Sequence, residues 1–361
     1  GNVTMTGGTW TKTGESNFVV GDTGSGTMTM SGGIVDVAAS NGTDRGVTWV
    51  AETNNCTGVL TIQGSAEFRT DLVRVAVNSG TTGTLNLDGG TLKVRQILGG
   101  GGTDEVDFNG TQVIATAAST TFISGIDLAS VESGGLKVNS NGFAIASNQA
   151  LSGIGGLVKS GAGTFSLTGA NTYTGATSVT AGTLGLTGSL TSSSVSTSGT
   201  GVFSQSTGGS IAGSGITFTQ GSSGTSVLSG TNAYTGATTI SAGTLVAGSS
   251  TAFNNTSALI MSGAGGFDLG GYDAAFTGLN AGAVANTISN SGSGAGTDTL
   301  KIITPTANFT GLITDGAGSR KTAVSVGASF SPSNLNNTFS GGFNMLGVSA
   351  GGAATLKLTP I

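Results

Sequence analysis

Paired carboxylates are the side chains of this sequence that come closest to a reactive arrangement. Asp36, Glu67 and Lys93 occupy matching places in successive strand patterns. Two carboxylates close together could act as general acid and base, or bind a cation. The alternative, which we favour, is a ladder of exposed charges that keeps the outer face of a sheet soluble. The parity of the pattern changes by one between Gly32-Gly33 and Gly64-Ser65, so the stacking of these charges is left open.

Asp104, Glu105 and Asp107, which come after the glycine run at residues 99–102 and Thr103, are the best calcium candidates by composition. Calcium-binding β-rolls repeat a Gly-Gly-x-Gly-x-Asp nonapeptide, and that period is absent here. Alternation along a strand also turns Glu105 and Asp107 to the same, outward side. We therefore expect no metal site in this segment.

Motifs for nucleophilic or cofactor chemistry are missing from the sequence. The chain has no histidine, so its many serines lack the usual activating base. No Gly-x-Ser-x-Gly, P-loop or dinucleotide motif occurs between a strand and a helix. Residues 160–267 contain no Asp, Glu, Lys or Arg, whereas β-helix enzymes need carboxylates and a base converging on one face. We expect no catalytic residue and no cofactor, and a polysaccharide-degrading enzyme is the weaker alternative.

Charge and cysteine content exclude further classes. The 12 Lys and Arg against 17 Asp and Glu leave a net charge of −5, and the bases cluster only at Arg320-Lys321. A nucleic-acid-binding protein needs a basic stripe, so no nucleic-acid partner is expected. Cys56 is the only cysteine and is expected to be a buried small residue, since no internal disulfide can form. No run of 18 apolar residues is present, so no membrane insertion by this segment is expected.

A repeated stretch organises the chain. Residues 163–184 recur as residues 224–245, with 14 of 22 positions identical. Both copies contain short apolar alternations separated by glycine and small polar residues, which is typical of short strands joined by tight turns. The signature positions are Gly163, Leu167, Asn171, Tyr173, Gly175, Gly182 and Leu184 in the first copy, and Gly224, Leu228, Asn232, Tyr234, Gly236, Gly243 and Leu245 in the second.

The shared pattern, Gly-Thr-x-x-Leu-[Thr/Ser]-Gly-x-Asn-x-Tyr-Thr-Gly-Ala-Thr-x-[Val/Ile]-x-Ala-Gly-Thr-Leu, resembles the autotransporter-associated β-strand repeat of bacterial surface and secreted proteins. This resemblance implies a right-handed parallel β-helix and an extracellular or outer-surface location, but it implies little about activity. Residues 308–311 and 337–341 look like degraded copies of the Asn-x-Tyr-Thr-Gly centre, with Phe in place of Tyr. Residues 352–358 are similar to its Ala-Gly-Thr-Leu exit.

The N-terminal third repeats a strand, a turn and a second strand. The units start at positions 3, 28, 60, 85 and 106, and their spacings of 25, 32, 25 and 21 residues suit the coils of a solenoid. A further apolar alternation lies in each period. With the resemblance, this predicts an all-β fold, a right-handed parallel β-helix (β-solenoid) with three strands per coil of about 20–25 residues. Its expected inward columns are Met28 and Met30, Leu60 and Ile62, Leu85 and Leu87, and Val106 and Phe108.

Changes of pattern divide this one continuous solenoid into four segments. We expect N-terminal β-helix coils over residues 1–116, transitional coils over 117–160, autotransporter-type repeat coils over 161–304 and degenerate repeat coils over 305–361. At about 20 residues or slightly more per coil, the chain should make some sixteen coils.

The predicted function is that of a non-enzymatic structural protein, a stalk or fibre of a bacterial cell surface. Strand patterns at both ends without a polar cap leave two readings, an excised piece of a longer stalk or a subunit that associates end to end into a filament. An adhesin that binds glycans or surfaces is the alternative. Tyr173 and Tyr234 would then offer an outer aromatic patch, although we expect them to cover coil corners instead.

Overall fold

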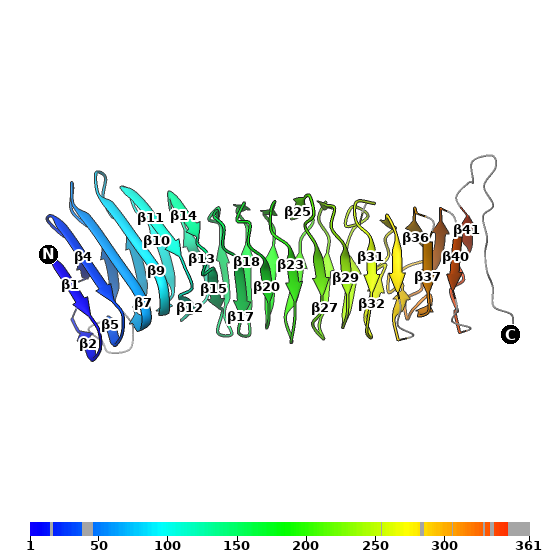
Figure 1. The fold of residues 1–361 in the computed structure, drawn as a ribbon, viewed down its shortest axis with the longest axis horizontal. Helices are drawn as coiled ribbons and strands as arrows, with labels where there is room; N and C mark the ends of the chain where they lie inside the picture. The colour runs from blue at the N-terminus through cyan, green and yellow to red at the C-terminus, as the bar shows by residue number, and fades with distance from the viewer. Residues whose placement is uncertain are drawn as a thin grey trace. The chain divides into compact units, whose positions relative to one another are not determined.

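The computed structural model describes residues 1–14, 17–37, 46–253, 255–281, 285–304, 306–327, 329–332 and 336–345. Their strands are parallel and stack as a β-solenoid of about 14 turns (Figure 1), which confirms the predicted fold class. Within these ranges there is no helix, and hence none suited to cross a membrane. The expected sixteen coils are too many because some coils are long: Leu279 pairs with Ala307 in the next coil.

Two units make up the chain, Gly1–Leu184 and Gly185–Ile361. Each is a stack of coils in which a strand finds its hydrogen-bond partners one coil earlier and one coil later. The four-segment division by sequence pattern stays a prediction. The proposed exit motif at residues 352–358 lies outside the described residues.

In the first unit the strands form three sides. The first side holds β1 (Asn2–Met5), β4 (Ser25–Met30), β7 (Thr57–Arg69), β9 (Thr82–Val94), β11 (Thr103–Phe108), β14 (Leu128–Val131) and the short β19 (Ala170–Asn171). The second side holds the later halves of β7 and β9 with β2 (Thr9–Lys12), β5 (Ile34–Val37), β12 (Gln112–Ala115), β15 (Leu136–Asn139), β17 (Leu157–Ser160) and β20 (Thr177–Val179). The third side holds β3 (Phe18–Val20), β6 (Val47–Val50), β8 (Leu72–Val75), β10 (Gln96–Gly99), β13 (Ser119–Ser124), β16 (Ala144–Ser147) and β18 (Thr164–Leu167).

In the second unit the same three-sided plan continues with shorter strands. One side holds β23 (Val195–Thr197), β26 (Phe218–Gln220), β29 (Thr238–Ile240), β31 (Leu259–Met261), β34 (Leu279–Ala281), β37 (Thr306–Phe309) and β40 (Ser329–Pro332). The next holds β24 (Val202–Gln205), β27 (Thr225–Leu228), β30 (Thr244–Ala247), β32 (Gly266–Asp268), β35 (Thr287–Ser289) and β38 (Leu312–Ile313), and β21 (Thr183–Leu186) includes the end of the first unit. The remaining side holds β22 (Ser189–Leu190), β25 (Ser210–Gly213) and β28 (Ala233–Tyr234), then β33 (Ala274–Phe276), β36 (Thr297–Ile302), β39 (Lys321–Val326) and β41 (Phe343–Met345).

The register in the first unit matches the predicted coil lengths. Val3 pairs with Met28, Met28 with Leu60, Leu60 with Leu85, and Leu85 with Val106. The predicted inward side chains are 0–2% exposed, so each column is a continuous apolar row inside the coil. Cys56, also predicted to be buried, is 2% exposed, and its Sγ lies 3.2 Å from the carbonyl oxygen of Gly21.

An extra residue at the corner of β7 explains the shift of parity seen in the sequence, since Met30 pairs with Ile62 but Ile34 pairs with Glu67. The pairing slips between Gly64 and Glu67, and the chain bends there from the first side to the second. Gly90 lies at the matching corner of β9, in the next coil, and has a φ of 67°. A Cβ at Gly90 would lie 2.4 Å from the carbonyl oxygen of Ala66, so only glycine fits.

We expect Leu85→Ala to destabilise the first unit by about 2–5 kcal/mol, because it leaves a cavity between Leu60 and Val106 that the stacked coils cannot close. The matched control is Thr84→Ala, which changes the neighbouring outward side chain and should shift stability by less than about 0.5 kcal/mol. Hydrogen exchange of the amides in β7, β9 and β11 measures the local free energy of opening. Equal protection in the two variants would contradict the inward column.

Candidate functional site

The signature residues of the repeat lie inside the coils. Leu167, Leu184, Leu228 and Leu245 are each 0% exposed. Asn171, Asn232, Tyr173 and Tyr234 are no more than 2% exposed, although all four are polar. The side chains that the two copies share therefore lie in the interior and not on a surface that a ligand could reach.

The two tyrosines occupy equivalent places in their coils. Tyr173 Oη lies 2.6 Å from Thr177 Oγ1, and Tyr234 Oη lies 2.7 Å from Thr238 Oγ1. Both threonines are also fully buried, so each hydroxyl group is satisfied inside the coil. Neither ring offers a face for glycan stacking, and the outer aromatic patch is not formed.

The two asparagines bind backbone groups at coil corners. Asn232 Oδ1 accepts from the Ile211 amide at 3.0 Å, and its Nδ2 donates to the carbonyl oxygen of Ala252 at 3.1 Å. One side chain thus links the coil before it to the coil after it. Asn171 Oδ1 similarly accepts from the Leu151 amide, at 3.2 Å.

The signature glycines permit these corners. Gly182 and Gly243 have φ values of 63° and 58°, which other residues adopt at a cost, and Gly163 also has a positive φ, of 88°. A Cβ at Gly175 would lie 2.4 Å from the carbonyl carbon of Gly155, in the coil before it. The remaining two have ordinary backbone angles but no space: a Cβ would lie 2.5 Å from backbone at Gly236 and 2.8 Å from a side chain at Gly224.

The predicted acid pair is part of a mixed charge ladder on the outer face of β5, β7 and β9. Arg69, which the sequence analysis did not include, lies 3.3 Å from Asp36 and also binds Glu67. Lys93 Nζ lies 2.7 Å from Glu67. Partial burial would raise the pKa of Glu67, but hydrogen bonds from Lys93 and Arg69 hold it below its ordinary value. The favoured alternative, an exposed charge ladder, describes this geometry, and the carboxylates are paired with bases rather than with each other.

The acidic residues after the glycine run, Asp104, Glu105 and Asp107, lie on opposite faces of β11. Asp104 is buried, and its carboxylate accepts from the amides of Gly100 at 3.1 Å and Asp127 at 2.8 Å. Glu105 and Asp107 lie on the outer side of β11. Burial, and then the charge of Glu105, raises the pKa of Asp107 to about 6. Among the residues that the structure describes, no group of three potential ligands is placed to hold a metal ion.

A buried lysine is the main feature that the sequence analysis missed. Lys159 is 0% exposed, and its Nζ donates to the carbonyl oxygens of Ser160, Gly161 and Ala181 at 2.8–3.0 Å. Burial lowers its pKa to about 8. Gln220 occupies the same place in the second copy, and its Nε2 donates to the carbonyl oxygen of Gly224 at 3.0 Å. The sequence did hold one signal for this role, because Lys159 and Gln220 occupy the same position of the repeat. Both side chains are structural groups that bind carbonyl oxygens at coil corners.

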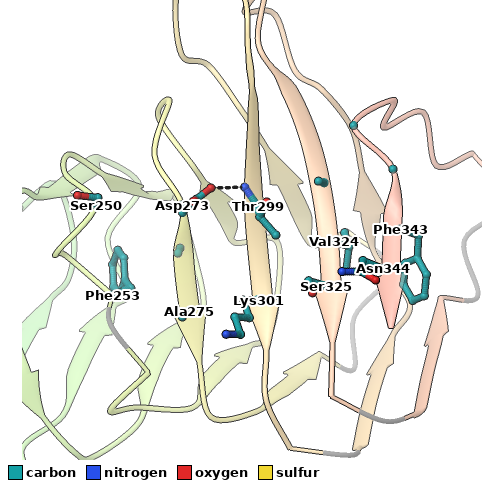
Figure 2. Close-up of a pocket in the computed structure, with 14 residues that line it drawn as sticks. Ser250, Phe253, Asp273, Ala275, Thr299, Lys301, Val324, Ser325, Phe343 and Asn344 are labelled. Atoms are coloured by element: carbon teal, nitrogen blue, oxygen red, sulfur yellow. Dashed lines mark hydrogen bonds between the residues drawn. The ribbon is translucent and has the colours of Figure 1, made fainter. Parts of the chain in front are cut away.

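The described residues of the second unit form a groove with a volume of about 590 Å³. It lies over β33, β36, β39 and β41 and is closed at one end by Ser250 and Phe253 (Figure 2). The sequence pattern does not reveal the groove, because residues that pair across its strands lie 19 to 26 residues apart in the chain.

Burial raises the pKa of Tyr234 to about 12, so its ionisation should be absent from Tyr234→Phe in an absorbance titration at 295 nm. At neutral pH the variant should lose about 1 kcal/mol, the worth of one buried hydrogen bond. The neutral phenol stabilises the folded state below pH 10, and this stabilisation is lost as the pH rises towards 12. The stability difference should therefore shrink in alkali.

Tyr272→Phe is the control for this titration, since that side chain is 41% exposed. It should leave the component near pH 12 unchanged. If Tyr234→Phe instead removed an ionisation with the ordinary value for an exposed phenol, the inward placement of the ring would be wrong.

The chain matches one known family of sequence repeats. The model of the passenger-associated-transport-repeat matches residues 157–186 and residues 218–247. These two stretches contain all fourteen signature positions, together with Lys159 and Gln220. No curated protein and no solved structure matches the chain. The chain therefore carries two passenger-associated-transport-repeats, the repeat of autotransporter passengers, and both lie in coils of a parallel β-solenoid.

Proposed function

We propose that this chain is a segment of an autotransporter passenger that serves as a non-enzymatic stalk outside a bacterial cell. The two repeats and the β-solenoid fit a passenger domain, which is a secreted or outer-surface protein. The observation that carries the structural role is the burial of the signature side chains. Asn232 binds backbone groups of the neighbouring coils, and Tyr234 binds Thr238 inside the coil. The repeated side chains therefore serve to hold the stacked coils together.

The arrangement of charge supports the same function. Asp36 and Glu67 are paired with Arg69 and Lys93, and Asp298 is paired with Arg320. A catalytic carboxylate would need a free proton-transferring oxygen beside a substrate. These paired groups instead stabilise the outer faces and corners of coils.

The stalk proposal can be tested in the full-length protein on the cells that produce it. Deleting residues 163–223 removes one whole repeat period and joins Ala162 to Gly224 in phase. Because coils stack only on neighbours, we expect this variant to remain on the surface, reached by antibody on intact cells. Deleting residues 163–213 is the out-of-phase control and should reduce surface display and protease resistance strongly. Labelling only after permeabilisation, or equal loss of display in both variants, would contradict the proposal.

End-to-end association is a second candidate, favoured by the first coil. Val3 and Trp10 are 46% and 43% exposed there, although both belong to inward columns. They line a hollow of about 300 Å³ beside Phe18, and Trp10 contacts the Phe18 ring edge to face, with ring centroids 5.2 Å apart. An unpaired strand edge with an apolar row beside it can accept a further parallel strand. We propose that a second copy of the chain supplies this strand.

Sedimentation velocity over a hundredfold range of protein concentration, with electron microscopy, tests this association. Wild type should form longer particles as concentration rises, and Trp10→Lys should prevent it by placing a charge in the apolar row. Ile154→Lys is the matched control, since Ile154 is 68% exposed and lies away from the first coil. Single particles of constant length at every concentration would exclude the filament.

A further inference from the structure

The groove in the second unit collects polar side chains that have no partner in the described part of the protein. Ser325 is only 5% exposed, yet its hydroxyl group makes no hydrogen bond there. The amide of Asn344 and the ammonium group of Lys301 also lack partners among those residues. Polar groups that face a groove without a protein partner can bind a ligand in place of water.

The strands set these groups in one row across the groove. Ala275 pairs with Lys301, Lys301 with Ser325, and Ser325 with Asn344. Because the register is parallel and unbroken, the four side chains lie side by side on the outer face (Figure 2). The small side chain of Ala275 leaves space above the sheet at one end of this row.

A second row runs beside the first and adds an acceptor. Asp273 accepts from the Thr299 amide at 2.7 Å through one carboxylate oxygen, and Thr299 pairs with Ala323. Asp273 and Lys301 are the two ionisable side chains among the described residues that line the groove. Ala323 continues this second row, and its small side chain keeps the floor of the groove low there.

The composition of the groove favours a sugar with a carboxylate over other ligands. Hydroxyl groups both donate and accept, which suits Asp273, Ser325 and Asn344 together. One lysine opposite one carboxylate is too little positive charge for a polyphosphate. The backbone groups of β36 and β39 are already paired with strands on both sides, so no strand edge is free for an extended peptide.

We propose that this groove binds a short acidic oligosaccharide, with the sugar carboxylate on Lys301 and ring hydroxyl groups on Asp273, Ser325 and Asn344. The volume of about 590 Å³ lies within the range of small-molecule sites. This activity goes beyond the stalk, which needs no ligand. A chain that is displayed on the surface but binds no sugar would leave the stalk proposal intact and overturn this one.

Saturation-transfer NMR and titration calorimetry on the whole chain test the site with trigalacturonic acid and sialyllactose, and with maltotriose as the neutral probe. We expect at least one acidic sugar to bind, and maltotriose to bind more weakly. Lys301→Gln should weaken binding about tenfold or more, since it removes a charge-assisted hydrogen bond. Raising the salt concentration should weaken wild-type binding and affect Lys301→Gln less.

Two further variants keep the result unambiguous. Ala323→Leu fills the floor from an outward position and should prevent binding while leaving thermal unfolding unchanged. Lys137→Gln removes a lysine from the outer side of β15 in the first unit and should bind as wild type does. The proposal is overturned if none of the acidic sugars binds, if maltotriose binds equally well, or if both Lys301→Gln and Ala323→Leu bind like wild type.

Discussion

Parallel stacking of each coil on the next is the constraint on which the rest of the structure depends. A strand in this fold has no partner within its own coil, so its backbone groups are satisfied only by the coils before and after it. Met28, Leu60 and Leu85 show the result, since each lies over its equivalent and none is more than 2% exposed. Inward positions must therefore repeat in kind, whereas outward positions are free to vary.

The corners are more demanding than the sides. At each corner the chain turns out of the ladder, and its carbonyl and amide groups would be left unpaired inside the coil. Lys159 and Gln220 donate to these carbonyls, while Asn171 and Asn232 accept from corner amides. A charged side chain and a neutral one serve at the same repeat position because each supplies several donors there.

Function can differ along the chain because the side chains on the outer face are free to vary. The first unit places a ladder of paired charges there, with Arg69 between Asp36 and Glu67. The second unit places small side chains, the ammonium group of Lys301 and the nearly buried hydroxyl group of Ser325 around a groove. The same strands can serve as a stalk and carry a ligand site, because inward side chains stack the coils and outward side chains line the groove.

Local pattern was enough to predict the coils of this protein, because alternation and glycine spacing act over a few residues. It predicted the columns through Leu60 and Leu85 and the position of the two repeats. Which outward side chains meet was decided only by the tertiary structure, because a partner lies a whole coil away and coils differ in length. The inward turn of Tyr234 and the row from Lys301 to Asn344 both follow from stacking, which the linear sequence does not display.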